Sequence, residues 1–230
     1  MFTKTAVMAC ISIGLASAAS PGHDTQFVKQ IYSDVLGRSP DRATSTMWIT
    51  FLQNGGARIQ VANALTSSQE YHKLLVDQVY MDYLNRPPAS DEVNFWLAWL
   101  QQGATDDQLR AQVLASDEFY GKAGGTNDLF LNQLYLEVLG VPIDRFALAS
   151  FNQLLTQGTP RLTIATVVLT SLAAEQRKVQ QWSVRFLRMT ADPTLLANYS
   201  AALKGGAADE QIIDLILASD AYYAFATHGH

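Results

Sequence analysis

Histidine and acidic side chains are the residues of this 230-residue sequence that could bind a metal or move protons. The four histidines do not form a ligand set, since only His228 and His230 lie close together in the sequence. A protein zinc site uses three or four ligands, so we expect no metal site. Two acidic pairs, Asp106-Asp107 and Asp209-Glu210, stand where a helix should begin. The helix dipole explains acidic residues at such positions, and no calcium-loop motif accompanies them.

Motifs of the common catalytic classes are missing from the sequence. It contains no Gly-x-Ser-x-Gly, no His-Glu-x-x-His and no glycine-rich phosphate loop. Cys10 is the only cysteine, and it falls within the segment that we assign below to a signal peptide. The mature chain would then have no thiol nucleophile. We therefore expect no catalytic residue, no cofactor and no enzymatic activity.

Three side chains are candidates for a binding surface: Arg38, Arg86 and Trp99. Each arginine follows a residue that should end a helix, and a guanidinium group there could clamp an anion or a partner's carboxylate. The alternative interpretation is that each arginine bonds the carbonyl groups of its own helix end or a nearby acid. Trp99 could stack on a sugar ring, although aromatic residues at helical spacing with leucine also form a core.

One block of residues recurs four times, and its helices must position any such site. In each copy a glycine precedes a serine by 13 residues; the pairs are Gly55 and Ser68, Gly103 and Ser116, Gly158 and Ser171, and Gly206 and Ser219. The steps between copies are 48, 55 and 48 residues for both landmarks. A period near 50 residues is typical of a helical array. The sequence therefore predicts an all-α fold, an array of four degenerate repeats of three to four helices each.

Glycine, asparagine and serine divide each repeat into short helices. The first helix should end at Gly37, Asn85 or Gly140, because glycine and asparagine tolerate the left-handed backbone conformation best. The second helix carries an aromatic residue with leucine at i+4, which places both on one side. The shared serine should cap a fourth helix. Two such helices are expected to continue unbroken into the next repeat, over residues 69–84 and 173–189.

Changes in composition divide the chain into segments. Residues 1–18 have the charge, apolar stretch and small-residue cleavage site of a secretory signal peptide. A lipoprotein acylated at Cys10 is the competing interpretation. A glycine-rich connector, residues 121–126, separates repeats one and two (25–120) from repeats three and four (127–226). We expect two helical lobes, one on each side of this connector.

Charge and hydropathy restrict the partners and the location of the protein. The formal net charge is −5, and no basic run exceeds Arg177-Lys178, so nucleic acid is not an expected partner. No segment after the signal peptide approaches the roughly 20 apolar residues of a membrane span. We expect a secreted or periplasmic protein without a membrane span.

The first half of the chain resembles a known bacterial family. The run Leu36-Gly37-Arg38-x-Pro40-Asp41, followed by Trp48 and by Ser68-x-Glu70-Tyr71, is similar to the family catalogued as domain of unknown function 4214. The resemblance covers about residues 25 to 125 and implies a protein with tandem copies, secreted or surface-layer-like. The same stretch is similar, more weakly, to the repeat domain of phycobilisome linkers. That resemblance implies an all-helical fold that joins proteins together, and neither family supplies a catalytic residue.

These observations predict an exported, non-enzymatic helical-repeat protein with a binding or structural role. Its partner would be a protein or a cell-surface polymer. The alternative is a secreted enzyme that acts on polysaccharide in a cleft between the two lobes, lined by Trp99, Asp91 or Glu137. A self-assembling layer protein is a third alternative.

Overall fold

The computed structural model describes residues 21–228 of the chain. This part contains fourteen α-helices and no strand, which confirms the predicted all-α class. The predicted signal peptide, residues 1–18, lies outside the described residues. None of the described helices combines the length and the hydrophobicity that a membrane span requires.

The helices follow one another through short turns and loops. In chain order they are α1 (Pro21–Leu36), α2 (Arg42–Gln53), α3 (Arg58–Thr66), α4 (Gln69–Leu84), α5 (Ser90–Gln101), α6 (Asp106–Ala115), α7 (Asp117–Lys122), α8 (Asn127–Leu139), α9 (Arg145–Thr156), α10 (Arg161–Leu169), α11 (Leu172–Trp182), α12 (Pro193–Lys204), α13 (Asp209–Ala218) and α14 (Asp220–His228). A π-helical turn, η1 (Ser183–Leu187), continues α11.

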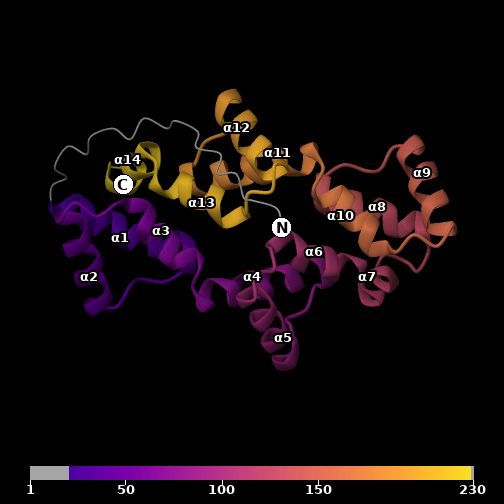
Figure 1. Cartoon of the computed structure of the whole chain (residues 1–230), viewed down its shortest axis with the longest axis horizontal. Coiled ribbons are helices and arrows are strands. Elements are labelled where there is room, and N and C mark those ends of the chain that lie inside the picture. Colours follow the sequence, from indigo (N-terminus) through magenta and orange to yellow (C-terminus); the bar gives the residue numbers. More distant parts are fainter. Residues whose placement is uncertain (1–20, 229–230) are drawn as a thin grey trace, which may run out of the picture.

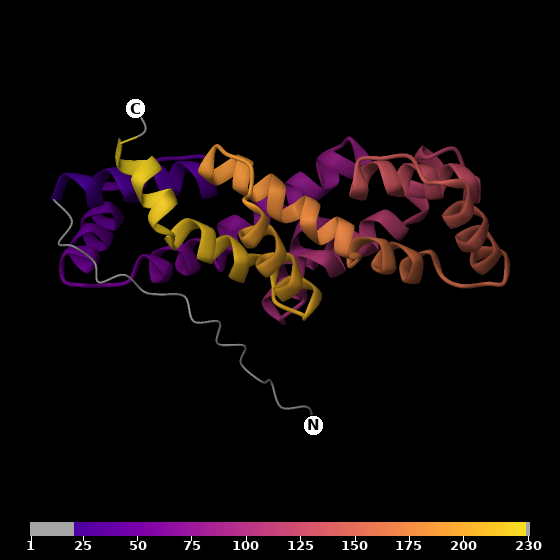
Figure 2. The same cartoon turned by 90° about the horizontal axis from the view of Figure 1, so that it is seen from above.

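The helices form an elongated assembly in which the first and last helices of the chain lie together. At one end α1 and α3 lie beside α13 and α14, and at the other end are α7 to α10 (Figure 1). Helices α4 to α6 lie between these ends, together with α11 and α12. Figure 2 shows the same elongated shape from above.

Two hydrophobic clusters hold this assembly together. The first, which we call the terminal core, is built by both ends of the described chain. It buries Phe27 and Ile31 of α1 and Val61 of α3 together with Ile212 of α13 and Tyr222 of α14. All five side chains are almost completely excluded from solvent, so these distant segments stabilise each other by burial of apolar surface.

The second cluster, the middle core, is built by the central part of the chain. It buries Leu109 and Leu114 of α6 with Phe130 and Leu134 of α8 and Ile164 of α10. Helix α6 packs against α10 here, as α3 packs against α13 in the terminal core.

The described structure does not show the two lobes that the sequence predicted, residues 25–120 and 127–226. Each core takes helices from both sides of the connector, because α3 finds its packing partner in α13 and α6 finds its partner in α10. The connector itself, residues 121–126, lies between the end of α7 and the start of α8. Its backbone turns through positive φ values at Gly124 (114°) and Gly125 (69°).

Left-handed residues end the helices at the predicted positions. The φ angle is 68° at Gly37, 49° at Asn85 and 72° at Gly140. Arg188 adopts the same conformation, with a φ of 58°, although neither glycine nor asparagine marks this position. Its guanidinium group bonds Asp34 at 2.9 Å. This contact helps to offset a conformation that costs a residue with a Cβ about 1–2 kcal/mol.

The shared serines cap helices, as predicted. The hydroxyl oxygen of Ser68 accepts a hydrogen bond from the backbone N–H of Tyr71 at 3.1 Å, and the hydroxyl donates to the carbonyl of Leu65 at 2.6 Å. The other three shared serines make the same two kinds of bond. Each serine therefore satisfies a free N–H at a helix start and fixes the preceding helix end to it.

Only one of the two expected long helices is unbroken. Helix α4 runs from Gln69 to Leu84, as predicted. The prediction of one helix over residues 173–189 was wrong, because α11 ends at Trp182 and the chain continues as η1. A π-helical turn changes the direction in which the following side chains point, and Phe186 is buried in the terminal core.

Candidate functional site

Acidic side chains of the protein bind the two candidate arginines. Arg38 forms a bidentate ion pair with Glu70, with N–O distances of 2.5 and 2.6 Å. Arg86 does the same with Glu118, at 2.7 Å for both contacts, and with Glu92, at 2.8 Å for both. These bonds hold the pKa of Glu70 and of Glu118 below the ordinary value and lower the pKa of Glu92 to about 2. Each guanidinium group thus links one helix end to a helix that starts at a shared serine.

The arginine and its glutamate partner are lost together in the second half of the chain. There the arginine position holds Val141 and Met189, and the glutamate position holds Ala173 and Ala221. Joint replacement is the pattern that a structural pair produces, because either partner alone would lose its bidentate bond. This pattern favours the interpretation in which Arg38 and Arg86 serve the fold.

Trp99 is half-buried in α5 and packs against the middle core. Its ring centroid lies 5.4 Å from that of Trp96, whose Nε1–H donates to the hydroxyl of Tyr80 at 2.8 Å. The structure does not bring the three candidate binding residues into a shared cavity. Neither Arg38, Arg86 nor Trp99 lines either of the two cavities described below.

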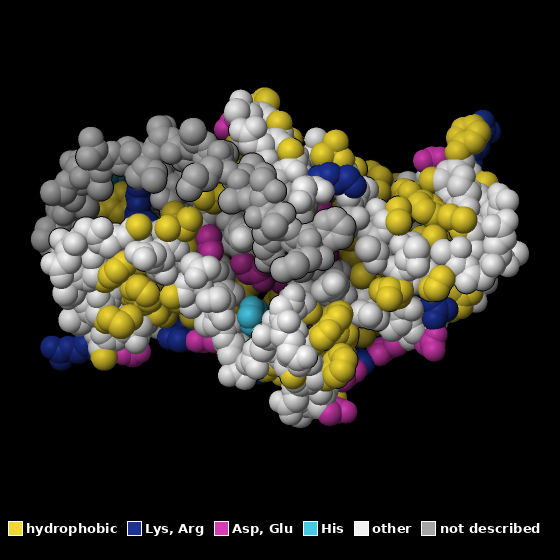
Figure 3. Space-filling view, viewed as in Figure 1, with side chains coloured by type: hydrophobic (Ala, Val, Ile, Leu, Met, Phe, Trp, Pro, Cys, Tyr) yellow, Lys and Arg dark blue, Asp and Glu magenta, His cyan; other side chains and the backbone are white. Residues whose placement is uncertain are grey.

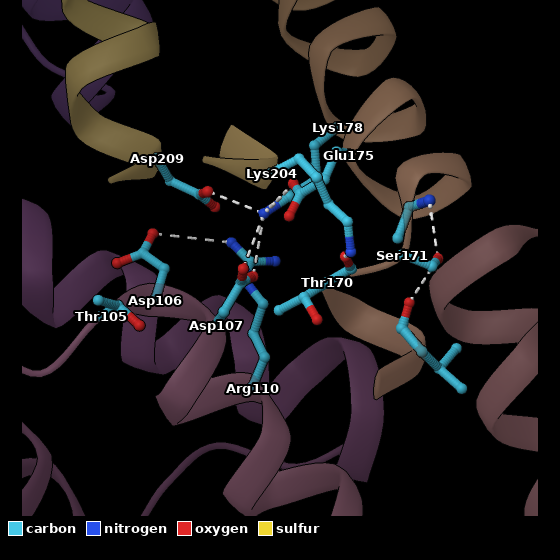
Figure 4. A network of polar contacts seen from close by, with 12 residues as sticks. Thr105, Asp106, Asp107, Arg110, Thr170, Ser171, Glu175, Lys178, Lys204 and Asp209 are labelled. Carbon is cyan, nitrogen blue, oxygen red and sulfur yellow. Dashed lines mark hydrogen bonds and ion pairs between the residues drawn. The ribbon is translucent and has the colours of Figure 1, made fainter. Parts of the chain in front are cut away.

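A buried charge network that the sequence did not reveal lies where α6, α11 and α13 meet (Figure 4). The ammonium group of Lys178 is its centre. Its Nζ donates hydrogen bonds to the two carboxylate oxygens of Asp107 at 3.0 and 3.1 Å and to Asp209 at 2.8 Å. It also forms an ion pair with Glu175 at 2.8 Å. Asp106 lies beside this group, and we call these five residues the Lys178 network.

Two helix starts and one helix turn position the network. Asp106 and Asp107 are the first two residues of α6, and Asp209 is the first residue of α13. The positive end of a helix dipole stabilises carboxylates at these positions. Glu175 and Lys178 lie one turn apart on α11. One member of each acidic pair, Asp107 and Asp209, therefore also joins its helix to α11 through Lys178.

Burial dominates the electrostatics of the network. The side chains of Asp106 and Glu175 are each 2% exposed, and that of Lys178 is 13% exposed. Burial raises the pKa of Asp106 well above its ordinary value, and the acidic groups of α13 raise it further. Burial also raises the pKa of Asp107 and of Glu175, although Lys178 acts in the opposite direction. Burial lowers the pKa of Lys178, but its acidic neighbours outweigh that effect and raise it.

Three carboxylates of the network have the spacing of a metal-ligand set. Asp107, Glu175 and Asp209 each offer an oxygen within 4.8 Å of the others. The ammonium group of Lys178 contacts all three, so a cation of the protein occupies the centre of the set. The lysine accounts for the cluster, and we assign no metal to it. The absence of a metal site stays a prediction.

The Lys178 network lies between two cavities. The central cavity, of about 800 Å³, is lined by residues of α1, α4, α6, α8 and α11. A smaller cavity of about 200 Å³ lies between the start of α6 and the α12–α13 turn. Asp106 lines both cavities. Acidic side chains are visible near the middle of the molecule in Figure 3.

The central cavity is polar and carries both signs of charge. Four acidic and four basic side chains line it, together with Tyr71, Tyr83 and Trp182. Glu137, one of the three residues that we associated with an enzymatic cleft, is among the acidic ones. The other two, Trp99 and Asp91, do not line the cavity.

The fold and the site define an all-helical protein in which recurring residues form helix caps and helix contacts, with a buried ion network beside a polar cavity. Residues 16–75 match the family model described as Domain of unknown function (DUF4214). The resemblance to this family is thus confirmed for the first copy of the pattern, whereas tandem copies and the similarity to phycobilisome linkers stay predictions. No curated protein and no solved structure matches the chain.

One signal in the sequence could have pointed to the network. Asp106 and Asp209 each follow their shared glycine, Gly103 or Gly206, by three residues. Acidic residues in the same register at two helix starts are a candidate pair for one shared cation. The lysine could not be assigned from the sequence, because Lys178 lies 71 residues from Asp107 and on a different helix.

Proposed function

We propose that the mature protein is an exported, non-enzymatic helical-repeat protein with a binding or structural role, and that its partner is a protein or a cell-surface polymer. The observation that carries the proposal is the use of the recurring residues. The shared serines cap helices, and the signature arginines pair with the signature glutamates. These polar groups of the recurring motif bond within the fold. A partner would therefore bind at the cavity or on the outer surface.

Four degenerate repeats account for the spacing of the backbone features. The φ angle is positive at each shared glycine: 86° at Gly55, 93° at Gly103, 90° at Gly158 and 95° at Gly206. These positions and the left-handed helix ends follow the same steps of 48, 55 and 48 residues. In this interpretation the terminal core joins repeats one and four, and the middle core joins repeats two and three.

Export is supported by the composition of residues 1–18. We expect the full chain, expressed in a bacterium with a C-terminal tag, to accumulate in the periplasm or medium with the mass that remains after loss of this segment. The substitution Cys10→Ala should leave the product unchanged, whereas a lipoprotein would lose its lipid and its membrane association. Cytoplasmic accumulation of the uncleaved chain would contradict the proposal.

Binding to a surface polymer can be measured by co-sedimentation. The purified mature protein is mixed with insoluble peptidoglycan, chitin or cellulose, and the pellet and the soluble sugar are assayed. We expect saturable co-sedimentation with one of these polymers and no release of reducing ends. Failure to bind any of the three would leave a protein partner as the only form of the proposal, which cross-linking in the intact exporting cell would then test.

A secreted polysaccharide-degrading enzyme is the second candidate, since Glu137 lines the central cavity. Its carboxylate accepts a hydrogen bond from Gln133 at 2.6 Å. Release of reducing sugar by the wild-type protein, abolished by Glu137→Gln, would establish this candidate and refute the non-enzymatic one. We expect neither the wild-type protein nor Glu137→Gln to release sugar.

A further inference from the structure

The central cavity has the size and the position of a ligand site. Its volume of about 800 Å³ lies within the range of small-molecule pockets, roughly 300–1,000 Å³. It lies between helices that belong to both hydrophobic cores, with Val35 and Leu36 from the terminal core and Leu75 and Val138 from the middle core in its wall. A ligand there would contact segments far apart in the sequence.

Two buried polar atoms in the wall of this cavity are unpaired. The Asp106 side chain is 2% exposed, and its Oδ1 accepts no hydrogen bond from any residue in the range 21–228. The Nε–H of Arg110 likewise has no acceptor among these residues. The closest contact of the two groups, Oδ2 to Nη2, is 3.8 Å, which is too long for a hydrogen bond. Two neighbouring side chains of the cavity lining thus carry an unmatched acceptor and an unmatched donor, which is unfavourable.

The charges of the lining favour a neutral ligand. Four acidic and four basic side chains line the cavity, so their formal charges cancel. A multiply charged ligand would be repelled by one half of this set. Tyr71, Tyr83 and Trp182 add aromatic surface between the charged groups. A ligand with apolar C–H faces and many hydroxyl groups matches this combination, because a hydroxyl group both donates and accepts hydrogen bonds.

We propose that the central cavity binds a neutral carbohydrate, with two adjacent hydroxyl groups bonded to Asp106 and Arg110 and a sugar face against the tyrosine rings. This inference rests on the proposed binding function and specifies its ligand class. A hydroxyl group can donate to Oδ1 of Asp106 while its neighbour accepts from Nε of Arg110.

Arg177 supplies a second polar contact at the same cavity. It is half-buried on α11, lines the cavity and makes no hydrogen bond or ion pair with another described residue. Its guanidinium group lies directly against Gly140, where a Cβ atom would collide with it. The group is thus held in place by shape and keeps its donors available for a ligand.

Titration of the mature protein with soluble oligosaccharides tests the inference. The probes are maltotetraose, cellotetraose and chitotetraose, and the signals are heat and tryptophan fluorescence, since Trp182 lines the cavity. We expect one probe to bind saturably and the variants Asp106→Ala and Arg177→Ala to bind it at least about tenfold more weakly. Arg177→Ala removes a side chain without a partner in the described structure, so it should fold normally. The matched control Arg42→Ala removes an exposed arginine outside the cavity and should leave the affinity unchanged.

Two outcomes would overturn the inference, and they differ in what they say about the proposed function. If a probe binds equally well to wild type, Asp106→Ala and Arg177→Ala but not to Trp99→Ala, the ligand binds the outer surface and the binding function stands. If no probe binds the folded wild-type protein, the cavity is not a carbohydrate site, and the binding function then depends on the co-sedimentation and cross-linking results alone.

Discussion

Gly37 ends α1 with a φ of 68°, and no heavy atom lies within 4 Å of the place where a Cβ would be added. A substitution there changes the backbone energy and little else. We expect Gly37→Val to lower the free energy of unfolding by about 1–2 kcal/mol, and Gly37→Asn to lower it less, since asparagine tolerates the left-handed conformation. Urea denaturation measures both effects.

Gly121 is the matched control for this prediction. It lies within α7, has no positive φ and also has open space around an added Cβ. Gly121→Ala should therefore stabilise the protein, by roughly 0.5–1 kcal/mol, because alanine favours the helix. Equal losses at both glycines would show that the left-handed conformation is not what matters at Gly37.

Trp96 and Phe95 are neighbours in α5 with opposite environments. Trp96 is buried at 9% exposure and bonds Tyr80, whereas Phe95 is 60% exposed. We expect Trp96→Ala to cost about 3–5 kcal/mol through the cavity it leaves, and Phe95→Ala to be nearly neutral. Thermal and urea unfolding of the two variants compare them. A small effect at Trp96 would contradict its place in the middle core.

The Lys178 network joins the N-terminal ends of α6 and α13 to α11 and makes the free energy of unfolding depend on pH. The pKa values of Asp106, Asp107 and Glu175 are raised in the folded state, so these groups hold protons more tightly there than in the unfolded chain. Their contribution to stability is full below the ordinary carboxyl pKa of about 4 and is lost as the pH rises through the raised values. We expect the free energy of unfolding to increase when the pH is lowered from 7 to 5.

The exposed ion pairs act in the other direction at lower pH. The pKa of Glu92 is about 2 and those of Glu70 and Glu118 are also lowered, so their contribution is lost as the pH falls below about 4. The stability curve should therefore have its maximum at mildly acidic pH. Asp106→Asn should be more stable than wild type at pH 7 and show a smaller rise toward pH 5. A wild-type stability that increases steadily from pH 5 to 8 would contradict the buried network.

Lys178 can be tested directly by its removal. Lys178→Met preserves length and leaves three carboxylates without their cation, which should cost about 3–5 kcal/mol at pH 7. Protonation of the carboxylates should reduce this cost at pH 5. Lys29→Met, which replaces an exposed lysine of α1, is the control and should have little effect at either pH.

Features that depend on a few neighbouring residues could be predicted from the sequence. Contacts between helices far apart in the sequence could not. The serine caps and the left-handed ends at Gly37 and Asn85 follow from backbone needs of a few neighbouring residues. Arg188 stands 48 residues after Gly140, in register with the other left-handed helix ends, but it was missed because arginine, unlike glycine or asparagine, does not mark that conformation. The Lys178 network was missed because its partners are far apart in the sequence, with Asp107 71 residues from the lysine. No periodicity in the sequence carries that information.

The arrangement of the whole molecule differs from the expectation because neighbouring repeats were assumed to pack on each other. The hydrogen bond from Asn63 of α3 to Asp214 of α13, at 3.1 Å, instead joins segments 151 residues apart. Both residues stand eight positions after their shared glycine, Gly55 or Gly206. Positions with the same offset from two different glycines thus contact each other, whereas the sequence predicted packing between segments adjacent in the chain.

Division of the chain at the connector tests this arrangement. Residues 21–122 and 126–230 each supply helices to both cores, so neither fragment alone can complete either core. We expect each fragment to lack cooperative unfolding and near-ultraviolet circular dichroism, and an equimolar mixture to regain both. Two fragments that fold independently would instead restore the sequential lobes that the sequence predicted.

The contact between α1 and α14 also determines when during synthesis the terminal core can form. Phe27 emerges from the ribosome long before Tyr222, its neighbour in the finished protein, and about 200 residues of synthesis take roughly 10–40 s. During that interval the nascent chain cannot complete the terminal core. Helix α1 therefore stays without its partner α14 until synthesis is nearly finished.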